Sequence, residues 1–591
     1  MPPAPPAPAH PMAAFRAEAV ALAAAAAATL GHSGGLPDPE VPPDPAMGEL
    51  GIPCFALAKV LRRGPPAIAA ELAKAVPAAG RTWVAEVRAA GPYLNFSVDR
   101  RKLGAAVLAD PDRALRAAPV AGKVLFEHTS ANPNGPLHVG RARNPIVGDT
   151  LARILRAAGH DVEVQYYMDN LGRQVATLAW GKWNIDSATL PPAGRAKTDH
   201  DLVRYYQAAH ELAKTDPAVG AKVRDVVERL ESADPQLLPK VREVYEACFA
   251  GMQDSLHRLG VHHDTVKDES DVVEDGSVAK VVAALKGLPS AAQEADGANY
   301  LDLSAQLKGQ KDKFYFTRKD GSSVYATRDI AYHAWKAQQV GSAGRLVDVL
   351  GEDHRLQALQ VGVALEALGV ARPTVVFYSF VSLPQAGGKG SGKMSTRANR
   401  VVFVDDLLDE GARLAYDEVA KRRGAELGEA EMRRIAEAVG VAAVRFNIAR
   451  IQPEKPIEFR WEEALSFDGD SAPYLMYAHA RAASLLRKAA EAGLEVGPVA
   501  AGDLGDGELR LLLAVARFQD AAQEAARQLA PHRMAGYALE LAGAFNEYYR
   551  DHRVLEADPV QQKARLAAMA AGHKALRRTL DTLGIPALDS M

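Results

Sequence analysis

The spacing of apolar positions predicts two helices and a pair of strands near the start of the chain. FRAEAVALAAAAAATLG (15–31) and AIAAELAKAV (67–76) are typical of helices. TWVAEVRAAGPYLNFSV (82–98) is typical of a strand, a turn and a second strand. Between the two helices, PDPEVPPDP (37–45) is too rich in proline for the interior of a helix or strand. We therefore expect a small α+β domain over residues 1–105.

The pattern changes in the middle of the chain. KVLFEH (123–128) predicts a buried strand, IVGDTLARILRAA (146–158) a helix and DVEVQYYM (161–168) a second strand. A strand, a polar loop, a helix and another strand in succession form a βαβ unit, in which the two strands run parallel. This part of the chain therefore predicts a parallel sheet.

Helical, charged sequence follows over about residues 200–260. Strand and helix patterns then alternate again, in SSVYATRDIAYHAWKA (322–337), LVDVLG (346–351), LQALQVGVALEALG (356–369) and TVVFYSFVSL (374–383). From about residue 405 to the end, one helical pattern follows another. These patterns predict a multidomain α/β protein with a helical C-terminal region.

Composition narrows the class of protein. A chain of 591 residues is too long for one hydrophobic core, and its 48% hydrophobic and 24% charged residues are ordinary for a globular protein. Its two cysteines, Cys54 and Cys248, are far apart, which excludes a disulfide framework and favours an intracellular protein. The run AVALAAAAAA (19–28) lacks a preceding basic cluster, so we interpret it as a soluble helix. The net charge of −3 gives no general attraction to nucleic acid, so an RNA partner would need local basic patches.

Hydrogen-bonding residues gather directly after the first strand of the βαβ unit, in HTSANPNGPLHVGRARNP (128–145). Ligands bind parallel sheets at the carboxyl ends of strands, and the following helix N-terminus attracts phosphate. Gly140 would let a ligand approach the backbone, His138 can donate to a phosphate oxygen, and Arg141 adds a permanent charge. Taken alone, HVGR also fits a surface loop without a ligand.

A second loop of phosphate-binding type follows the last predicted strand. GGKGSGKMSTR (387–397) is rich in glycine and carries Lys389, Lys393 and Arg397. Such a loop can close over a triphosphate and stabilise the charge on departing pyrophosphate. Taken alone it also fits a solvated basic loop. Two such loops, each placed after a strand of the parallel sheet, favour a nucleotide site.

Several longer stretches carry a resemblance to a known family. They are FEHTSANPNGPLHVGRARN, YYMDNLGRQ (166–174), SSVYATRDIAY, KMSTR and SFDGDSAPYLMYAHARAASLLRKA (466–489). HVGR is similar to the HIGH signature of class I aminoacyl-tRNA synthetases, and KMSTR to their KMSKS signature. In this combination and order, the stretches resemble the arginyl-tRNA synthetases. The resemblance runs from about residue 15 to the C-terminus.

The resemblance implies a fold and an activity. The expected domains are an N-terminal tRNA-contacting α+β domain (1–105), a Rossmann-type catalytic domain (120–400) with a helical insertion (about 180–260), a helical connector (405–440) and an all-α anticodon-binding domain (440–591). The implied enzyme is an arginine–tRNA ligase, which forms arginyl-adenylate from L-arginine and ATP with Mg²⁺ and then charges tRNA(Arg). We expect a cytoplasmic monomer without a protein-bound metal or a membrane partner.

Site residues follow by matching the family's motifs. The catalytic set is His138, Arg141, Lys393 and Ser395. The ATP-binding set is Asn134, His138, Gly140, Gly351, Asp353 and Lys393. The arginine-binding set is Asn132, Glu269, Tyr325, Asp329 and His354, and the tRNA-binding set is Tyr474, Tyr477 and Arg481.

Some of these assignments have competing interpretations. The family has histidine where this chain has Arg141, and glutamine is common where it has His354. Tyr325 and Asp329 share one face of a predicted helix, which suits a guanidinium, but Asp329 would equally suit a surface salt bridge to Arg328 or Lys336. The tyrosines of the tRNA-binding set would equally suit helix packing.

Two rival functions fit parts of this evidence. Another class I synthetase is one, although the acidic set with Tyr325 suits a cationic amino acid. A catalytically inactive RNA-binding relative is the other, suggested by Arg141. The second is disfavoured because His138, Lys393 and the carboxylates are all retained.

Overall fold

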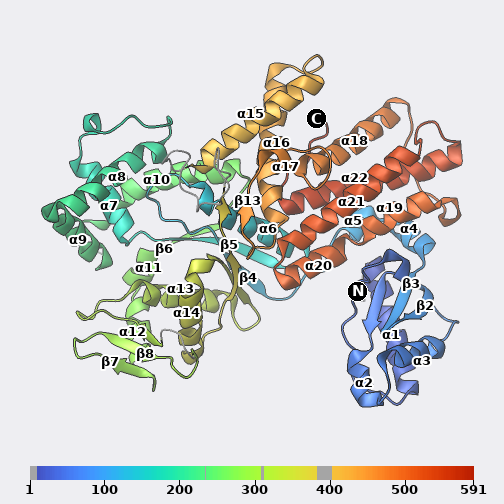
Figure 1. Ribbon diagram of the computed structural model, residues 1–591, viewed down its shortest axis with the longest axis horizontal. Helices are drawn as coiled ribbons and strands as arrows, with labels where there is room; N and C mark the ends of the chain where they lie inside the picture. The colour runs from blue at the N-terminus through green and yellow to red at the C-terminus, as the bar shows by residue number, and fades with distance from the viewer. Residues whose placement is uncertain (1–9, 233, 308–311, 383–401) are drawn as a thin grey trace, which may run out of the picture.

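The computed structural model describes residues 10–232, 234–307, 312–382 and 402–591 (Figure 1). The chain begins with an α+β domain at the lower right of that view. Its helices are α1 (Pro11–Thr29), α2 (Phe55–Leu61) and α3 (Pro65–Ala75), and its antiparallel strands are β1 (Leu50–Pro53), β2 (Val84–Ala90) and β3 (Tyr93–Val98). The strand order β1-β3-β2 places β3 in the centre. The predicted strand pair over 82–98 is therefore confirmed.

Helix α1 is long and apolar enough to cross a membrane by length and composition, and it is the one such helix among the described residues. Its residues Phe15, Ala19 and Ala23 recur every four positions and are buried. This stripe is one face of a helix, and it packs with α3 and β2. The buried alanine stripe is thus the packing face of a domain helix, as we interpreted the sequence.

The central sheet has five strands in the order β11-β10-β4-β5-β6, and every pair is parallel. The strands are β4 (Lys123–Glu127), β5 (Asp161–Met168), β6 (Thr265–Asp268), β10 (Arg345–Gly351) and β11 (Thr374–Tyr378). From β4 the chain runs outward to β5 and β6, whereas β10 lies on the other side of β4. The chain direction therefore switches between β4 and β10, which is where ligands bind such sheets.

Helices and a small sheet are inserted between these strands. The helices are α6 (Arg143–Ala157), α7 (Arg173–Asn184), α8 (Thr198–Thr215), α9 (Pro217–Glu231), α10 (Leu238–Arg258), α11 (Glu269–Glu274), α12 (Ser277–Lys286), α13 (Tyr325–Val340) and α14 (Arg355–Ala367). The small antiparallel sheet consists of β7 (Ala291–Gln293), β8 (Asn299–Asp302) and β9 (Lys313–Tyr315). Figure 1 shows α7 to α10 at the left, above that sheet. The helical character of 200–260 is confirmed, whereas the small sheet was not predicted.

The predicted single strand over 374–383 is wrong in its extent. Strand β11 ends at Tyr378, and Val381–Ser382 forms a separate short strand, β12. This strand pairs with β13 (Ile457–Glu458) from the C-terminal part of the chain. A pairing partner so distant in sequence is invisible to a local pattern.

The C-terminal region consists almost entirely of helices. They are α15 (Val404–Arg423), α16 (Glu429–Ala449), α17 (Trp461–Ala464), α18 (Ala472–Glu491), α19 (Asp506–Ala516), α20 (Phe518–Gln528), α21 (Pro531–Asp551) and α22 (Pro559–Leu583). Helices α15 and α16 form a hairpin in which Gly440 lies against Gly411; a Cβ on Gly440 would be 2.7 Å from the Ala412 backbone nitrogen. Helix α4 (Arg100–Ala109) joins the N-terminal domain to this bundle by packing on α19.

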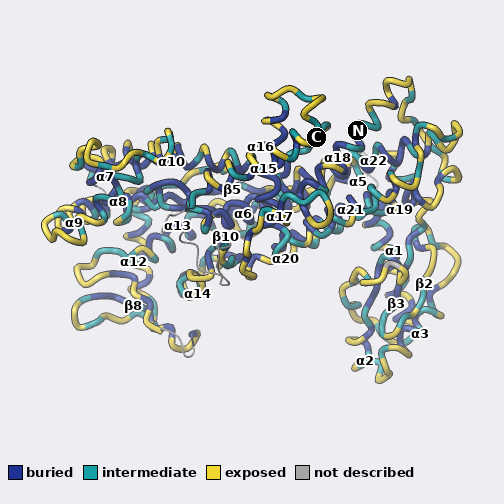
Figure 2. Tube along the Cα trace, turned by 45° about the horizontal axis from the view of Figure 1, so that its top comes forward, coloured by how far each residue is buried: buried dark blue, intermediate teal, exposed yellow. Residues whose placement is uncertain are grey.

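Helix α6 lies where the five-stranded sheet meets the helical bundle, in the buried centre of the molecule (Figure 2). All of its residues are buried except Arg153 and Arg156. It contacts α16, α20, α21 and α22. The fully buried guanidinium of Arg445, on α16, donates to the Asp149 carboxylate of α6 and to the Leu259 carbonyl oxygen at 2.7 Å. This arginine joins three elements that are far apart in sequence.

Replacing Arg445 by alanine should lower the free energy of unfolding by about 1–3 kcal/mol, because it leaves the buried Asp149 carboxylate with Arg153 as its remaining cation and removes the donor to the buried Leu259 carbonyl oxygen. The matched control is Arg433→Ala on the same helix, since that side chain is 74% exposed and should change stability by no more than about 0.5 kcal/mol. Urea and thermal unfolding followed by circular dichroism measure both. Equal effects of the two substitutions would contradict this role of Arg445.

Candidate active site

The stretch 128–145 lies at the switch point between β4 and β10. Directly after β4, Thr129 and Ser130 adopt left-handed backbone conformations, with φ of 71° and 38°. Asn144 holds this bend: its Oδ1 accepts from the Thr129 backbone N–H at 2.8 Å, and its Nδ2 donates to the Val349 carbonyl oxygen of β10 at 3.0 Å. Left-handed backbone is costly for a β-branched residue such as Thr129 and is found mainly where structure or function requires it.

A 3₁₀ turn (Val139–Arg141) precedes α6, which begins at Arg143. Pro145 therefore falls in the first turn of α6, where backbone N–H groups have no partner within the helix. Its missing N–H costs nothing there. The kink that would follow if the helix began at His138 does not arise.

His138 and Arg141 face different environments. Arg141 is exposed, whereas His138 is half-buried. Burial and the Arg141 charge lower the pKa of His138 to about 4. Near neutral pH, His138 is therefore an uncharged imidazole that can donate one hydrogen bond, and the permanent positive charge comes from Arg141.

The chain that follows the second predicted phosphate loop is fastened to HVGR. The Val139 N–H donates to the Val402 carbonyl oxygen at 2.9 Å, and the Val404 N–H donates to the Leu137 carbonyl oxygen at 2.7 Å. The loop residues themselves lie outside the described residues; they are Lys389, Lys393, Ser395 and Arg397. The exit of that loop thus lies beside the predicted catalytic histidine.

Two residues of the predicted ATP-binding set, Gly351 and Asp353, lie at the carboxyl end of β10. Gly351 ends the strand, and a 3₁₀ turn (Glu352–His354) follows, in which Asp353 and His354 are exposed. A Cβ on Gly351 would come within 2.4 Å of an Asp353 carboxylate oxygen. Glycine at this position leaves room for the Asp353 carboxylate to fold back over the strand end.

Tyr325 and Asp329 lie one turn apart at the start of α13, as the i, i+4 spacing predicted. The Asp329 carboxylate is paired with the His333 ring, at 3.0 Å between Oδ1 and Nδ1, and is 24% exposed. The suggested salt bridges to Arg328 and Lys336 are wrong, because both of those cations are held by other carboxylates. Asp329 therefore keeps an accessible edge toward solvent.

Glu269 is fully buried at the start of α11. Its Oε1 accepts from Arg328 Nε at 2.7 Å, and its carboxyl group also lies against the Asp169 carboxyl group. Burial, with the nearby Asp169 carboxylate, raises the pKa of Glu269 to about 8. Asp169 also accepts from Asn132 Nδ2 at 3.2 Å. Asp169 therefore links Asn132 with Glu269, and both of these belong to the predicted arginine-binding set.

A buried charge network that the sequence did not predict lies beside Asp329. The Lys336 ammonium is fully buried and contacts Glu127 at 2.8 Å and Asp348 at 2.9 Å. Asp348 also contacts the His333 ring, at 2.7 Å. His333 therefore lies between Asp348 and Asp329. Burial and Lys336 act to lower the pKa of His333, but these two carboxylates outweigh them and raise it to about 10.

The network has a partial signal in the sequence. His333 and Lys336 follow Asp329 at four and seven positions, on one helical face. Their carboxylate partners come from strands that are distant along the chain, which no local spacing reveals. The same network extends to the bend that precedes HVGR, because Ser130 Oγ in that bend donates to Glu127 Oε1 at 2.9 Å.

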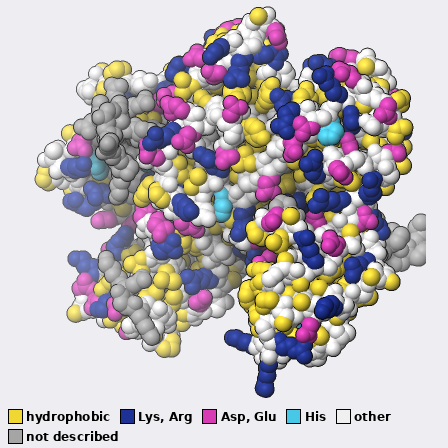
Figure 3. Space-filling view, turned by 45° about the vertical axis from the view of Figure 1, so that its right-hand side comes forward, with side chains coloured by type: hydrophobic (Ala, Val, Ile, Leu, Met, Phe, Trp, Pro, Cys, Tyr) yellow, Lys and Arg dark blue, Asp and Glu magenta, His cyan; other side chains and the backbone are white. Residues whose placement is uncertain are grey.

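The predicted tRNA-binding residues lie on one face of α18. The Arg481 guanidinium is 4.5 Å from the centre of the Tyr477 ring and 4.8 Å from that of Tyr549. Tyr477 is 42% exposed and Tyr474 is half-buried, so the two tyrosines are not both packing residues. Figure 3 shows basic and acidic side chains interspersed over the visible face of the molecule, without one large basic patch.

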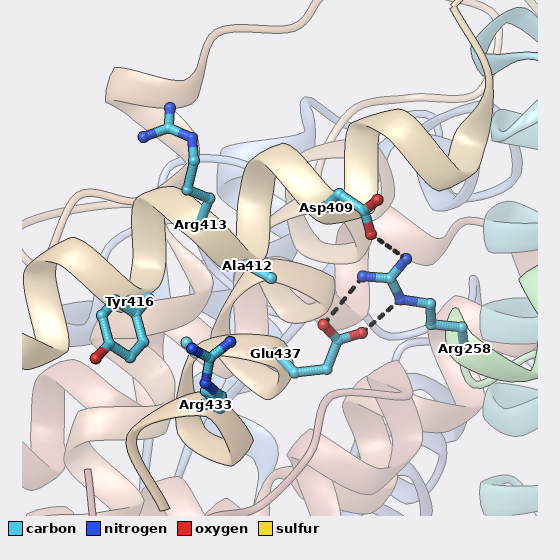
Figure 4. A pocket seen from close by; sticks show the side chains of 8 residues that line it. Arg258, Asp409, Ala412, Arg413, Tyr416, Arg433 and Glu437 are labelled. Carbon is cyan, nitrogen blue, oxygen red and sulfur yellow. Dashed lines mark hydrogen bonds and ion pairs between the residues drawn. The ribbon is translucent and has the colours of Figure 1, made fainter. Parts of the chain in front are cut away.

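A cavity of about 380 Å³ lies apart from these residues, between α10, α15 and α16 (Figure 4). It is lined by Arg258, Asp409, Ala412, Arg413, Tyr416, Arg433, Ala436 and Glu437. Arg258 is held between Asp409 and Glu437, at 2.6 Å from each. None of the predicted site residues lines this cavity, and its central cation is already paired, so we interpret it as a junction between helices.

Three known families match successive parts of the chain. The family described as "Arginyl tRNA synthetase N terminal domain" matches residues 18–98. The family described as "tRNA synthetases class I (R), catalytic domain" matches residues 105–461, and the "DALR anticodon binding domain" matches residues 475–591. Together these matches extend over most of the sequence.

Individual relatives agree with these matches. An arginine–tRNA ligase of Methanocella arvoryzae is 43% identical over 541 residues, which are 91% of this chain and 92% of that protein. One from Methanothrix thermoacetophila is 42% identical over 538 residues, with 91% and 92% covered. The solved arginyl-tRNA synthetase of Thermus thermophilus is 31% identical and superimposes with a TM-score of 0.82 over 98% of this chain and 100% of that one.

The raised pKa of His333 makes stability depend on pH. An unfolded histidine titrates near 6.5, so the protonated His333 stabilises the fold fully below that pH, and the contribution is lost as pH rises through about 10. The stability difference between the unsubstituted protein and His333→Gln should therefore shrink between pH 7 and pH 10. Urea midpoints at several pH values measure it, with the exposed His257→Gln as control. A difference that stays constant over this range would rule out a charged His333.

Proposed function

The chain belongs to the arginyl-tRNA synthetase family of class I enzymes, and from this we propose that it is an arginine–tRNA ligase acting at the loops between β4 and β10. It activates L-arginine with ATP to arginyl-adenylate and transfers the arginyl group to the 3′ end of tRNA(Arg). The observation that most supports arginine as the substrate is the accessible Asp329 carboxylate, one helical turn from Tyr325 and beside the switch point.

Activation joins the arginine carboxylate to the α-phosphate of ATP and expels pyrophosphate. No covalent bond to the enzyme is needed, so catalysis comes from positioning and from stabilising charge on the phosphates. The neutral His138 donates a hydrogen bond to a phosphate oxygen, and Arg141 supplies positive charge from the exposed side of the turn. Lys393 and Ser395 complete this set by their match to the KMSKS motif.

The nucleotide is held by backbone as much as by side chains. Gly140 and Asn134, in the loop before α6, let ATP approach the helix N-terminus. Gly351 and Asp353, at the end of β10, receive the ribose, whose hydroxyl groups can donate to the Asp353 carboxylate. Mg²⁺ enters with the ATP phosphates as part of the nucleotide substrate.

The amino acid lies between α13 and the loop after β4. Asp329 and Tyr325 bind the guanidinium, and Asn132, oriented by Asp169, receives the α-amino and carboxylate end. Glu269 is the further acidic contact of this set, and its buried carboxyl group is bonded to Arg328 and lies against Asp169. His354, exposed at the edge of β10, completes the set.

The tRNA is bound by the C-terminal bundle and the N-terminal domain. On α18, Tyr474 and Tyr477 stack on unpaired bases. The Arg481 guanidinium beside them is positioned by the rings of Tyr477 and Tyr549. The enzyme works as a monomer in the cytoplasm, where its tRNA partner is found.

ATP–pyrophosphate exchange tests the activity directly. We expect purified protein to exchange labelled pyrophosphate into ATP in the presence of arginine, and to require tRNA for this exchange. Lysine and citrulline serve as controls. Lysine keeps a positive charge but changes the shape of the side chain, whereas citrulline keeps the shape but lacks the charge. A folded protein with no exchange under either condition, or with exchange driven by another amino acid, would contradict the assignment.

Asp329→Asn removes the charge proposed to bind the guanidinium. A hydrogen bond to a charged group contributes about 1.5–3 kcal/mol, so kcat/KM for arginine should fall about 10- to 150-fold, mainly through KM. Asp271→Asn is the matched control, because Asp271 is near Glu269 on α11 but is paired with Lys267 at 2.8 Å. It should change kcat/KM by less than about twofold. Steady-state aminoacylation measures both, and equal losses would contradict the role of Asp329.

A further inference from the structure

Histidine and carboxylate side chains cluster at three places in the described part of the chain, with possible metal-ligand atoms within 4.8 Å of one another. In the first, formed by Glu127, His333 and Asp348, the Lys336 ammonium lies between the two carboxylates. In the second, formed by Asp199, His200 and Asp405, the Lys197 ammonium is 2.9 Å from Asp405 and 3.4 Å from Asp199. A lysine thus already supplies the positive charge at both of these clusters.

The third cluster differs from the other two. It consists of His479 on α18, His573 on α22 and Asp589 in the segment after α22. The two imidazole rings are 4.5 Å apart, with 30° between their planes. His479 is fully buried, and the Nε2 atoms of both rings are buried without a hydrogen-bond partner. Buried polar atoms without partners are uncommon and costly, so two in one place require an explanation.

The hydrogen bonding of His479 fixes which ring nitrogen carries the proton. Its Nδ1 is 3.0 Å from the Leu588 carbonyl oxygen, which can only accept, so Nδ1 must donate. In the neutral ring Nε2 then carries a lone pair.

We infer that His479, His573 and Asp589 bind a divalent transition-metal ion of the Zn²⁺ type. Two imidazole nitrogens and a carboxylate oxygen are a donor set that Zn²⁺ accepts, with water completing four ligands. The Nδ1–H bond of His479 to a backbone carbonyl is the outer contact that usually orients such a ligand. The ion satisfies both unpartnered Nε2 atoms and clamps the C-terminal segment 584–591 to α18 and α22.

The proposed metal site would also affect how α18 is held in the bundle. His479 lies between Tyr477 and Arg481 in sequence but is buried, whereas Tyr477 is exposed. The metal would therefore hold α18 from its inner side while the outer side carries the proposed tRNA contacts. The inference does not depend on those contacts, since binding is measured without tRNA.

Titration with Co²⁺ and Zn²⁺ tests the site on the full-length protein. Co²⁺ should bind with one equivalent and give visible absorption bands of a four-coordinate site, and Zn²⁺ should displace it. A 100-fold excess of Zn²⁺ over its Kd should raise the Tm of a chain of this length by about 2 °C. His573→Ala should weaken binding at least about 100-fold and abolish the bands, as should Asp589→Ala, whose exposed side chain can be removed without disturbing the core.

The matched control is a second histidine pair on the surface. His257 and His262 are both exposed, and their rings are 4.9 Å apart, so they could hold Co²⁺ adventitiously. The double substitution His257→Ala with His262→Ala should leave the bands and the Tm shift unchanged. Loss of binding in this control, unchanged binding in Asp589→Ala, or no bands in the unsubstituted protein would each overturn the inference.

Discussion

The active-site region depends on the Lys336 ammonium, which is buried between two carboxylates of the central sheet. Strands β4 and β10 pair in a register that places Asp348 beside Glu127. Two buried carboxylates in such proximity cannot both be ionised without a cation. Lys336 supplies that cation from α13, and its pKa is raised by the two carboxylates although burial opposes this. The docking of α13 on the sheet is therefore an electrostatic requirement of the strand pairing.

The same interaction positions the proposed arginine pocket. Once Lys336 is fixed, the helical turn places His333 against Asp348, and His333 in turn holds the inner edge of Asp329. The outer edge of Asp329 is left for a guanidinium. On the other side, Glu127 accepts from Ser130 in the strained bend before HVGR. The amino acid and nucleotide halves of the proposed site thus share one charge network.

Local patterns could predict the elements of this site but not the partners of its charges. The βαβ unit and the shared face of Tyr325 and Asp329 follow from spacing alone, and both are present. The pairing of Arg328 with Glu269 spans 59 residues, and that of Lys336 with Glu127 spans 209. The sequence suggested ion pairs between neighbouring residues, such as Asp329 with Arg328 or Lys336. In the folded chain these buried cations instead pair with carboxylates that are distant in sequence. The small sheet β7-β8-β9 escaped prediction because its strands are only three or four residues long.

The presence of arginine at position 141 can be explained by its effect on the nearby His138. A histidine at this position would share its titration with His138, and two imidazoles near phosphates would bind with a strength that varies with pH. With arginine there, the positive charge is permanent, and that charge, together with burial, holds His138 in its neutral form. In the proposed site, charge and hydrogen bonding are thereby divided between two residues: Arg141 would supply long-range attraction to the triphosphate, which salt screens, and His138 would supply a short directional hydrogen bond. Under the proposed roles, the arginine at position 141 would therefore remove a pH dependence from phosphate binding while keeping both kinds of interaction.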